Sequence, residues 1–271
     1  MIVSTVNVNG IRAAVKERSA DNLGLLPWLA NTRADVVCLQ ETRADDEQFA
    51  SALAPALISG WHLAAAEPHL KGRNGVAVLS RHPFTQTRVG FGAEEFLAHG
   101  RYLEVDLDTP TGGLTVGSVY VQTGEADTAR QLEKERFMAA LAERMAELVA
   151  AGRDAVICGD WNIAHTEADI KAWKANVKKS GFLPSERAWV GTLLEAGWID
   201  VVRQAHPDVA GPYSWWSWRG KAFDNDAGWR IDYHLATAGL AARAVTAGTE
   251  KPADYAVRWS DHAPVTVEFG D

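Results

Sequence analysis

The chain has 271 residues, of which 47% are apolar, and its 27 Lys and Arg residues are outnumbered by 35 Asp and Glu residues, giving a net charge of −8. The apolar content suffices for a sizeable core. The acidic balance argues against a protein that coats nucleic acid nonspecifically through many contacts to phosphate. It does not exclude a nuclease, because acidic residues at a metal site are compatible with a local basic rim. With no membrane-length apolar run and no signal peptide, we expect a cytoplasmic protein.

Short apolar runs of strand length alternate with helical patterns along the chain, which predicts an α/β architecture. Thr109 to Gly113 is a strong turn signal, so the strands on either side of it are expected to form a hairpin. Cys38 and Cys158 both lie in strand-like runs and are interpreted as small core residues, not as a disulfide. The predicted strands are residues 2–6, 36–39, 76–80, 103–107, 114–119, 155–158 and 265–269.

Three helices are predicted, at residues 44–57, 126–151 and 185–196. Asp45 or Asp46 would cap the first, Gly152 would end the second, and Ser185 would cap the third. In the second helix the charges lie opposite the apolar stripe and are expected to form a solvated surface. The side chains expected to face the core are Phe137, Leu141, Met145 and Leu148 in the second helix and Trp189, Leu193 and Leu194 in the third. No linker divides the chain, so residues 1–271 are expected to form one domain.

The most basic stretch lies between the second and third helices. It contains Lys171, Lys174, Lys178 and Lys179 within residues 166–181. Lysines mostly lie on surfaces, so an ordinary exposed loop is one interpretation. A loop that contacts phosphate is the other.

Polar side chains repeatedly follow the predicted strands. Asn7, Glu41 and Tyr120 each come at or just after the end of one, and Asp160-Trp161-Asn162 follows another. Open α/β sheets bind ligands at such strand ends. Carboxylates such as Glu41 and Asp160 suit Mg²⁺, although turns and exposed surfaces also use these residue types.

His262 and Asp232 form a further candidate pair. His262 precedes the last predicted strand, and Asp232 lies in Trp229-Arg230-Ile231-Asp232-Tyr233. An Asp that orients a His is a recurrent device for holding a tautomer or stabilising imidazolium. The chain has no serine nucleophile elbow and no Walker loop, which disfavours a serine hydrolase and nucleotide-driven chemistry.

Aromatic residues are concentrated between Tyr213 and Trp218, followed by Trp229. Trp is usually largely buried, so a packing cluster is one interpretation. The alternative is a platform of rings against an unstacked nucleotide or an exposed deoxyribose.

Taken together, these motifs resemble the exonuclease III family of bacterial apurinic/apyrimidinic (AP) endonucleases, within the endonuclease/exonuclease/phosphatase superfamily. The resemblance covers nearly the whole chain in family order. Its segments are Asn7-Val8-Asn9-Gly10-Ile11-Arg12, Leu39-Gln40-Glu41-Thr42, Gly75-Val76-Ala77, Tyr120, Gly159-Asp160-Trp161-Asn162, Gly181-Phe182-Leu183-Pro184-Ser185-Glu186-Arg187, Ser214-Trp215, Trp229-Arg230-Ile231-Asp232-Tyr233 and Ser260-Asp261-His262.

The resemblance implies a four-layered α/β sandwich with two packed mixed β-sheets flanked by helices. It implies Mg²⁺- or Mn²⁺-dependent cleavage of duplex DNA 5′ to abasic sites. Accompanying 3′→5′ exonuclease and 3′-phosphatase or phosphodiesterase activity on blocked 3′ ends is also expected, as is a monomer.

The same resemblance implies roles for individual residues. Glu41 would be the main metal ligand with Asn7 nearby, and Asp261 would contact a second metal. Asp160 would orient or deprotonate the attacking water. The other metal contacts are expected from Asp160, Asn162 and His262, and the DNA contacts from Arg73, Asn74, Lys174, Trp215 and Trp229.

Three residues would act on the phosphate. Asn162 would hold a non-bridging oxygen, His262 oriented by Asp232 would stabilise developing charge, and Tyr120 would contact or protonate the phosphate. The family commonly has Pro two residues after this Tyr, where this chain has Gln122. Because Pro fixes φ, the loop after Tyr120 is expected to be looser here.

Two other functions fit parts of the pattern. A phosphatase or phosphodiesterase acting on small-molecule or lipid phosphates would use the same machinery, and the negative net charge favours it. A binding protein that has lost catalysis would recognise damaged DNA, but every expected catalytic position is filled.

Overall fold

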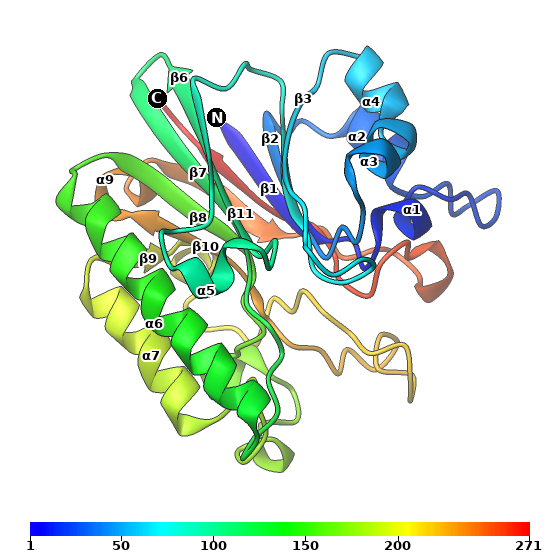
Figure 1. Cartoon of the computed structure of the whole chain (residues 1–271). Helices are drawn as coiled ribbons and strands as arrows, with labels where there is room; N and C mark the ends of the chain where they lie inside the picture. Colours follow the sequence, from blue (N-terminus) through cyan, green and yellow to red (C-terminus); the bar gives the residue numbers. More distant parts are fainter.

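The computed structural model describes residues 1–271 and contains two six-stranded mixed sheets packed face to face. Helices cover both outer faces (Figure 1). The predicted four-layered α/β sandwich is therefore confirmed. No helix of the structure is both long and apolar enough to cross a membrane.

The first sheet has the strand order β11-β12-β1-β2-β4-β3. Within it β1 and β2 are parallel, and every other neighbouring pair is antiparallel. Its strands are β1 (Ile2–Asn7), β2 (Val36–Gln40), β3 (His62–Ala66), β4 (Val76–Ser80), β11 (Ala244–Thr249) and β12 (Val265–Phe269).

The second sheet has the order β5-β6-β7-β8-β10-β9, again with one parallel pair, β7 and β8. The predicted hairpin is confirmed as β6 and β7, whose register joins Thr109 to Gly112 at the turn. Its strands are β5 (Gln86–Val89), β6 (Tyr102–Thr109), β7 (Gly112–Tyr120), β8 (Asp154–Asp160), β9 (Trp198–Asp200) and β10 (Asp232–Thr237).

Alternation along the buried strands divides their side chains between two cores. In β2, Val36 and Cys38 point into the core between the sheets, whereas Val37 and Leu39 face the helices. This follows from the two-residue period of a strand, and it explains why the strand is apolar on both faces. Cys38 and Cys158 are free and buried between the sheets, as predicted. Burial, together with the neighbouring Cys158 thiol, raises the pKa of Cys38.

The helices cover the two outer faces unequally. The four N-terminal helices pack on the first sheet, and α6 with α7 packs on the second (Figure 1). The helices are α1 (Ile11–Ala14), α2 (Leu25–Asn31), α3 (Asp46–Ala52), α4 (Ala54–Ile58), α5 (Glu94–Leu97), α6 (Ala129–Ala150), α7 (Pro184–Glu195), α8 (Val201–Ala205) and α9 (Ala238–Ala241).

The prediction of one continuous helix at 44–57 is wrong. It is two helices, α3 and α4, that meet at Leu53, and Pro55 lies in the first turn of α4. Proline lacks the N–H that a continuous helix would need there, so it begins a new helix instead. Asp45 is the N-cap of α3, accepting from the Gln48 N–H at 2.9 Å.

The ends of the other two predicted helices also differ. The helix α6 begins at Ala129 after the cap Thr128, three residues later than expected. The helix α7 begins at Pro184 with Leu183 as cap, so Ser185 is exposed and caps nothing. Pro184 outcompetes Ser185 because its fixed φ suits the first helical position.

The expectation that all charges of α6 are solvated is wrong for Lys134. Its side chain is 0% exposed and pairs with Glu186 of α7, which is also 0% exposed. Both residues lie three or four positions before apolar residues of their own helix, Phe137 and Val190, so they belong to the buried stripe.

Candidate active site

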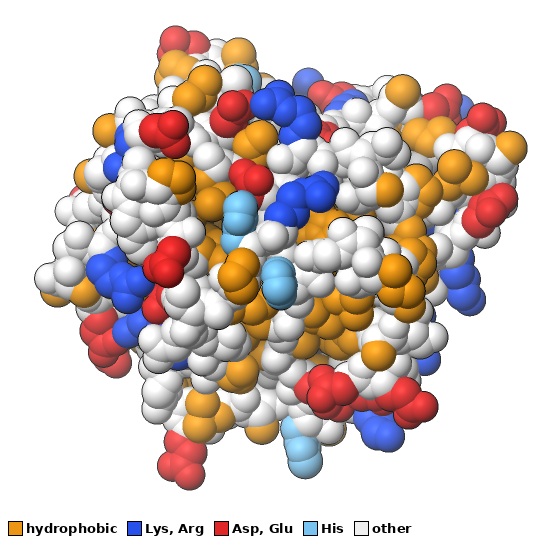
Figure 2. All heavy atoms as spheres, turned by 90° about the horizontal axis from the view of Figure 1, so that it is seen from above, with side chains coloured by type: hydrophobic (Ala, Val, Ile, Leu, Met, Phe, Trp, Pro, Cys, Tyr) orange, Lys and Arg blue, Asp and Glu red, His pale blue; other side chains and the backbone are white.

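Four strand ends meet at one edge of the sandwich. The parallel pair β1 and β2 ends with Asn7 opposite Gln40, which Glu41 follows. The parallel pair β7 and β8 ends with Tyr120 opposite Asp160. Because both parallel pairs end on the same side, their polar tips converge. The opposite end, where the termini lie, shows acidic and basic side chains interspersed among apolar ones (Figure 2).

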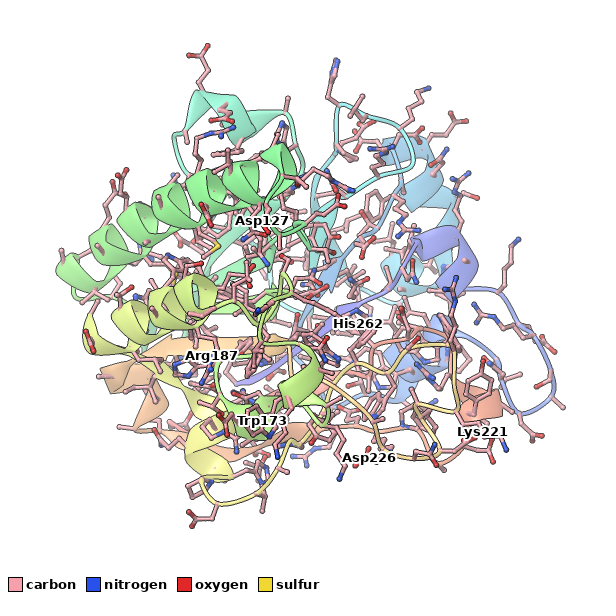
Figure 3. All side chains as sticks on the ribbon, turned by 90° about the horizontal axis from the view of Figure 1, so that it is seen from below. Asp127, Trp173, Arg187, Lys221, Asp226 and His262 are labelled. Atoms are coloured by element: carbon pink, nitrogen blue, oxygen red, sulfur yellow. The ribbon has the colours of Figure 1, made fainter.

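Two antiparallel strands complete the group. Asp232 begins β10 and stands opposite Asp160 in the register with β8. His262 precedes β12, which runs antiparallel to β1. Figure 3 shows His262 near the middle of this end of the molecule, with Trp173 and Arg187 to one side and Lys221 to the other.

Asn7 joins carboxylates that come from different sheets. Its Nδ2 donates to Glu41 Oε1 and to Asp160 Oδ2, both at 2.9 Å. Its Oδ1 accepts from the Asn9 N–H at 2.9 Å, so in this arrangement the nitrogen, not the oxygen, faces the acidic pair. The second oxygen of Glu41 pairs with Arg43.

Asp160 is held from a second direction by Asn162. The Asn162 backbone N–H donates to Asp160 Oδ1 at 2.9 Å, and its side-chain Nδ2 donates to Oδ2 at 3.1 Å. Nδ2 also lies 2.9 Å from the Val121 carbonyl, which connects Asn162 to the loop after Tyr120. Both oxygens of Asp160 are therefore fixed in direction.

His262 and Asp232 form the predicted pair. His262 Nδ1 lies 2.9 Å from Asp232 Oδ2, and Nε2 lies 3.7 Å from Asp160 Oδ2. Burial by itself lowers the pKa of His262, but the carboxylates of Asp232 and Asp160 raise it well above the ordinary value. Ser214 Oγ donates to the same oxygen of Asp232 at 2.6 Å.

The buried negative charge fits a divalent cation. Burial raises the pKa of Asp160, His262 opposes this, and the charges of Asp232 and Glu41 raise the pKa further. Burial, together with the charges of Glu41 and Asp160, raises the pKa of the Tyr120 phenol. Carboxylate oxygens are hard ligands of the kind that Mg²⁺ and Mn²⁺ take.

One group of possible ligand atoms lies close enough together for metal binding. Asp160, Asp232 and His262 offer ligand atoms within 4.8 Å of one another. However, Asp232 Oδ2 already accepts from Ser214 and faces His262. Glu41 and Asp160 are the other two carboxylates brought together here, since both accept from the same Asn7 nitrogen.

The other predicted metal contacts have protein partners. Asp261 accepts from Asn9 Nδ2 at 2.9 Å and from Trp215 Nε1 at 3.0 Å. Asn162 presents its amide nitrogen to Asp160. These residues lie at the site, where their present contacts orient neighbouring groups.

The aromatic segment is divided between core and surface. Trp216 is 1% exposed and donates to Asp226 at 3.0 Å, so the packing interpretation holds for it. Trp215 and Trp229 are half-buried, and their ring centroids lie 6.2 Å apart. The ring of Trp215 also lies 6.5 Å from that of His262, which places an aromatic wall directly beside the site.

A cavity of about 900 Å³ opens on the other side of Glu41 and Tyr120. Arg73 and Asn74 line it, and five of its lining residues are arginines against three glutamates, so it forms a local basic rim on an acidic protein. Lys174 is exposed, with Nζ 5.4 Å from the centroid of the Trp173 ring.

The loop after Tyr120 is well anchored despite the missing proline. Gln122 is 8% exposed, and its Nε2 donates to the Arg130 carbonyl of α6 at 3.2 Å. Val121 N–H donates to the Asp160 carbonyl at 2.9 Å. These bonds anchor the loop where the family commonly has Pro; the looser loop stays a prediction.

Comparison with known proteins identifies the relationship. The model of the Endonuclease/Exonuclease/phosphatase family matches residues 4–262. The chain belongs to this family. The resemblance drawn from the motifs is thereby confirmed.

Individual relatives match along the whole chain. An exodeoxyribonuclease of Bacillus subtilis (strain 168) is 35% identical over 259 residues, covering 96% of this chain and 95% of the relative. An AP endonuclease structure from Archaeoglobus fulgidus aligns with a TM-score of 0.88 at 27% identity, covering 100% of both chains. A Neisseria 3′ phosphatase bound to a product DNA hairpin aligns with a TM-score of 0.87 at 30% identity, covering 100% of this chain and 99% of that one.

Several residues at the site were not anticipated from the sequence. They are Asn9, Arg43, Lys134, Glu186 and Ser214, each of which holds a candidate residue or its loop. Lys134 and Glu186 carried a detectable signal, since each is a charge on an apolar helical stripe. Asn9 and Ser214 lie inside the recognised motifs without a pattern of their own.

Proposed function

We propose that this protein is a metal-dependent DNA-repair nuclease that hydrolyses the phosphodiester 5′ to abasic sites in duplex DNA. Accompanying 3′→5′ exonuclease and 3′-phosphatase or phosphodiesterase activity is part of the proposal. One observation carries it: the carboxylate of Asp160 lies between the Asn7–Glu41 pair and the His262–Asp232 pair, next to the Trp215–Trp229 wall.

Glu41 and Asp160 would hold Mg²⁺ or Mn²⁺, with Asn7 aligning the two carboxylates. When bound, such an ion polarises the phosphate and offsets its negative charge. The choice between the two metals is not fixed by oxygen ligands, since these suit both.

The remaining groups act on water and phosphate. Asp160 orients the attacking water and takes its proton. His262, held by Asp232, donates toward a non-bridging phosphate oxygen, and Asn162 contacts another. Tyr120 would stay protonated at neutral pH, as an ordinary phenol does, and would donate a hydrogen bond to the phosphate as charge develops. Most catalysis of phosphoryl transfer comes from such positioning and charge stabilisation.

DNA would lie across this end of the molecule. Trp215 and Trp229 supply the apolar wall for a sugar that lacks its base, and Arg73, Asn74 and Lys174 supply backbone contacts. The DNA hairpin bound to the Neisseria relative supports a nucleic-acid substrate. We further infer that residues 1–271 act as one catalytic domain, because both sheets contribute to a single site, and, from the family resemblance, as a monomer.

The decisive experiment uses a labelled duplex with one abasic-site analogue, incubated with Mg²⁺ or with EDTA, beside an undamaged duplex. We expect incision at the lesion only with metal and no internal cutting of the undamaged duplex, whose digestion from the 3′ end would report the proposed exonuclease activity. Incision should fall about 10²–10⁴-fold in Asp160→Asn and His262→Ala. Both variants should keep the wild-type fold by circular dichroism, although His262→Ala leaves the buried carboxylates of Asp232 and Asp160 without their partner and should lower the melting temperature. Near-normal rates in both purified variants would contradict the proposed roles.

A second function uses the same groups on small-molecule or lipid phosphates. The net charge of −8 favours it, whereas the aromatic wall and the arginine-lined cavity favour DNA. Competition between abasic duplex and a small phosphate ester separates the two. Failure to cut either duplex with any divalent metal would favour the small-phosphate function.

A further inference from the structure

A buried ion pair lies directly behind the site. Lys134 of α6 and Glu186 of α7 have side chains that are 0% exposed, with Nζ 2.7 Å from Oε1. Burial lowers the pKa of Lys134, and the carboxylate of Glu186 opposes this. A buried pair is unfavourable unless further hydrogen bonds satisfy both groups, so the positions of those bonds reveal what the pair does.

The hydrogen bonds of Lys134 end on the loops of the site. Its Nζ donates to the carbonyl of Asn162 at 3.1 Å and to the carbonyl of Thr123 at 3.2 Å. Asn162 has φ of 49°, in the left-handed region that non-glycine residues rarely adopt. The ammonium group therefore helps to hold a backbone conformation that is unfavourable by itself.

Glu186 fixes the third loop. Its Oε2 accepts from the N–H groups of Gly181 at 2.7 Å and Leu183 at 3.0 Å. The Gly181 carbonyl in turn accepts from Ala164 N–H at 2.8 Å, two residues beyond Asn162. The two charges together join α6 and α7 to the three loops that surround Asp160.

We propose that Lys134 and Glu186 are positioning residues of the nuclease reaction. They act through Asn162, whose backbone and side-chain nitrogens fix both oxygens of Asp160. The inference deepens the proposed function and rests on it only in treating Asp160 and Asn162 as reacting groups. A displacement of reacting groups by about 1 Å can cost roughly 10²-fold in rate.

A purely structural pair is the alternative, and α6 contains a suitable control. Arg144 pairs with Glu104, whose side chain is 1% exposed, at 2.8 Å. That pair lies ten residues further along the same helix, and its contacts do not reach Asn162 or Thr123. Arg144→Met therefore removes a basic partner of a buried glutamate on the same helix without touching the loops of the site, while Glu104 keeps its bond to Arg88 at 3.0 Å.

The test compares Lys134→Met, the double variant Lys134→Met/Glu186→Gln and Arg144→Met. The double variant removes both charges, while the amide oxygen introduced at position 186 still accepts from Gly181 and Leu183, which protects the fold if the single variant fails to fold. We expect kcat on the abasic duplex to fall about 10–100-fold in Lys134→Met and in the double variant, with KM within about threefold. Arg144→Met should keep the wild-type kcat even if its melting temperature falls.

A readout independent of turnover is the side-chain amide signal of Asn162 in protein labelled with ¹⁵N-asparagine. This signal should shift or broaden in the Lys134 variants and stay unchanged in Arg144→Met. A folded double variant with wild-type kcat and an unchanged Asn162 signal would overturn the positioning role. A wild type that does not incise abasic DNA would count against the proposed function instead, and the amide signal would still decide the positioning role.

Discussion

At the residue scale, Asn7 gives the site its connection between sheets. A neutral amide that donates to both Glu41 and Asp160 aligns two carboxylates without cancelling their charge. A lysine in its place would neutralise them and compete with a cation. The choice of asparagine is therefore consistent with a site that binds a metal ion.

Replacing Asn7 by Ala should weaken metal binding more than it slows the saturated enzyme. Partners that orient metal ligands typically contribute 10- to 100-fold to metal affinity, so the Mg²⁺ concentration for half-maximal activity should rise by about that factor. Activity measured across a Mg²⁺ titration checks this. Asn31→Ala, in α2 and away from the site, is the control; an unchanged Mg²⁺ requirement in Asn7→Ala would refute the orienting role.

Trp229→Ala should raise KM for abasic duplex by roughly 5- to 100-fold and change kcat little. Stacking of an aromatic ring against a nucleotide contributes about 1–3 kcal/mol, and Trp229 is a half-buried member of the wall. Trp216→Phe is the matched control, because Trp216 is buried and its loss should reduce stability without changing KM. Equal KM values for the wild type and Trp229→Ala would exclude Trp229 from the substrate pocket.

At the element scale, one hydrogen bond joins β10 to β1 across the interior. His234 Nε2 lies 3.1 Å from the Val3 carbonyl, which connects the two sheets. Burial lowers the pKa of His234 to about 4, although the bond to Val3 opposes the shift. The folded protein therefore keeps this histidine neutral at pH values where the unfolded chain protonates it.

The unfolding free energy should consequently decrease as the pH is lowered from 6.5, the pKa in the unfolded chain, to about 4, the pKa in the folded protein. In that window the unfolded state binds one proton more than the folded state, which lowers the unfolding free energy by about 3 kcal/mol in total. His234→Gln keeps a donor for Val3 and should lose this component. Urea unfolding of both proteins at pH 7, 5 and 4 checks the difference; parallel pH profiles would contradict it.

The element scale also shows what the sequence could and could not predict. Buried strands such as β2 and β8 were predictable because Val36 to Leu39 and Ala155 to Cys158 are apolar on both faces. The equally buried β10 was missed, because its buried Asp232 and His234 interrupt the apolar pattern. Edge strands such as β5 were missed, since residues such as Gln86 and Thr87 are exposed and carry no apolar pattern. The predicted start of α7 was wrong because Pro184, and not a residue after Ser185, occupies the first helical position.

The residues of the candidate site also divide into those that the sequence could predict and those that it could not. The strand-end residues Asn7, Glu41 and Asp160 could be predicted because each follows an apolar run in the sequence. Their partners at Ser214 and Lys134 could not, because those contacts depend on how loops and helices pack in three dimensions. Local periodicity carries no information on which carbonyl a buried ammonium group will reach.

At the scale of the whole molecule, DNA binding must overcome a net charge of −8. Attraction therefore depends on a few local cations. The Arg73→Ala/Lys174→Ala double variant should reduce the slope of log affinity against log salt by about 2, since each phosphate contact contributes about 0.9. Binding of an uncleaved abasic analogue, measured between about 50 and 200 mM salt, provides the test. A slope equal to that of the wild type would exclude both residues from phosphate contact.

The two carboxylates that Asn7 bridges are carried by different sheets, so the apolar layer between the sheets sets their separation. Cys38 and Cys158 lie in that layer, three and two residues before Glu41 and Asp160. The core here acts as a spacer between the two carboxylates that we propose as metal ligands. Replacing either cysteine by the smaller Ala or the bulkier Val should therefore shift the ratio of activity with Mg²⁺ to activity with the larger Mn²⁺, without altering any proposed ligand.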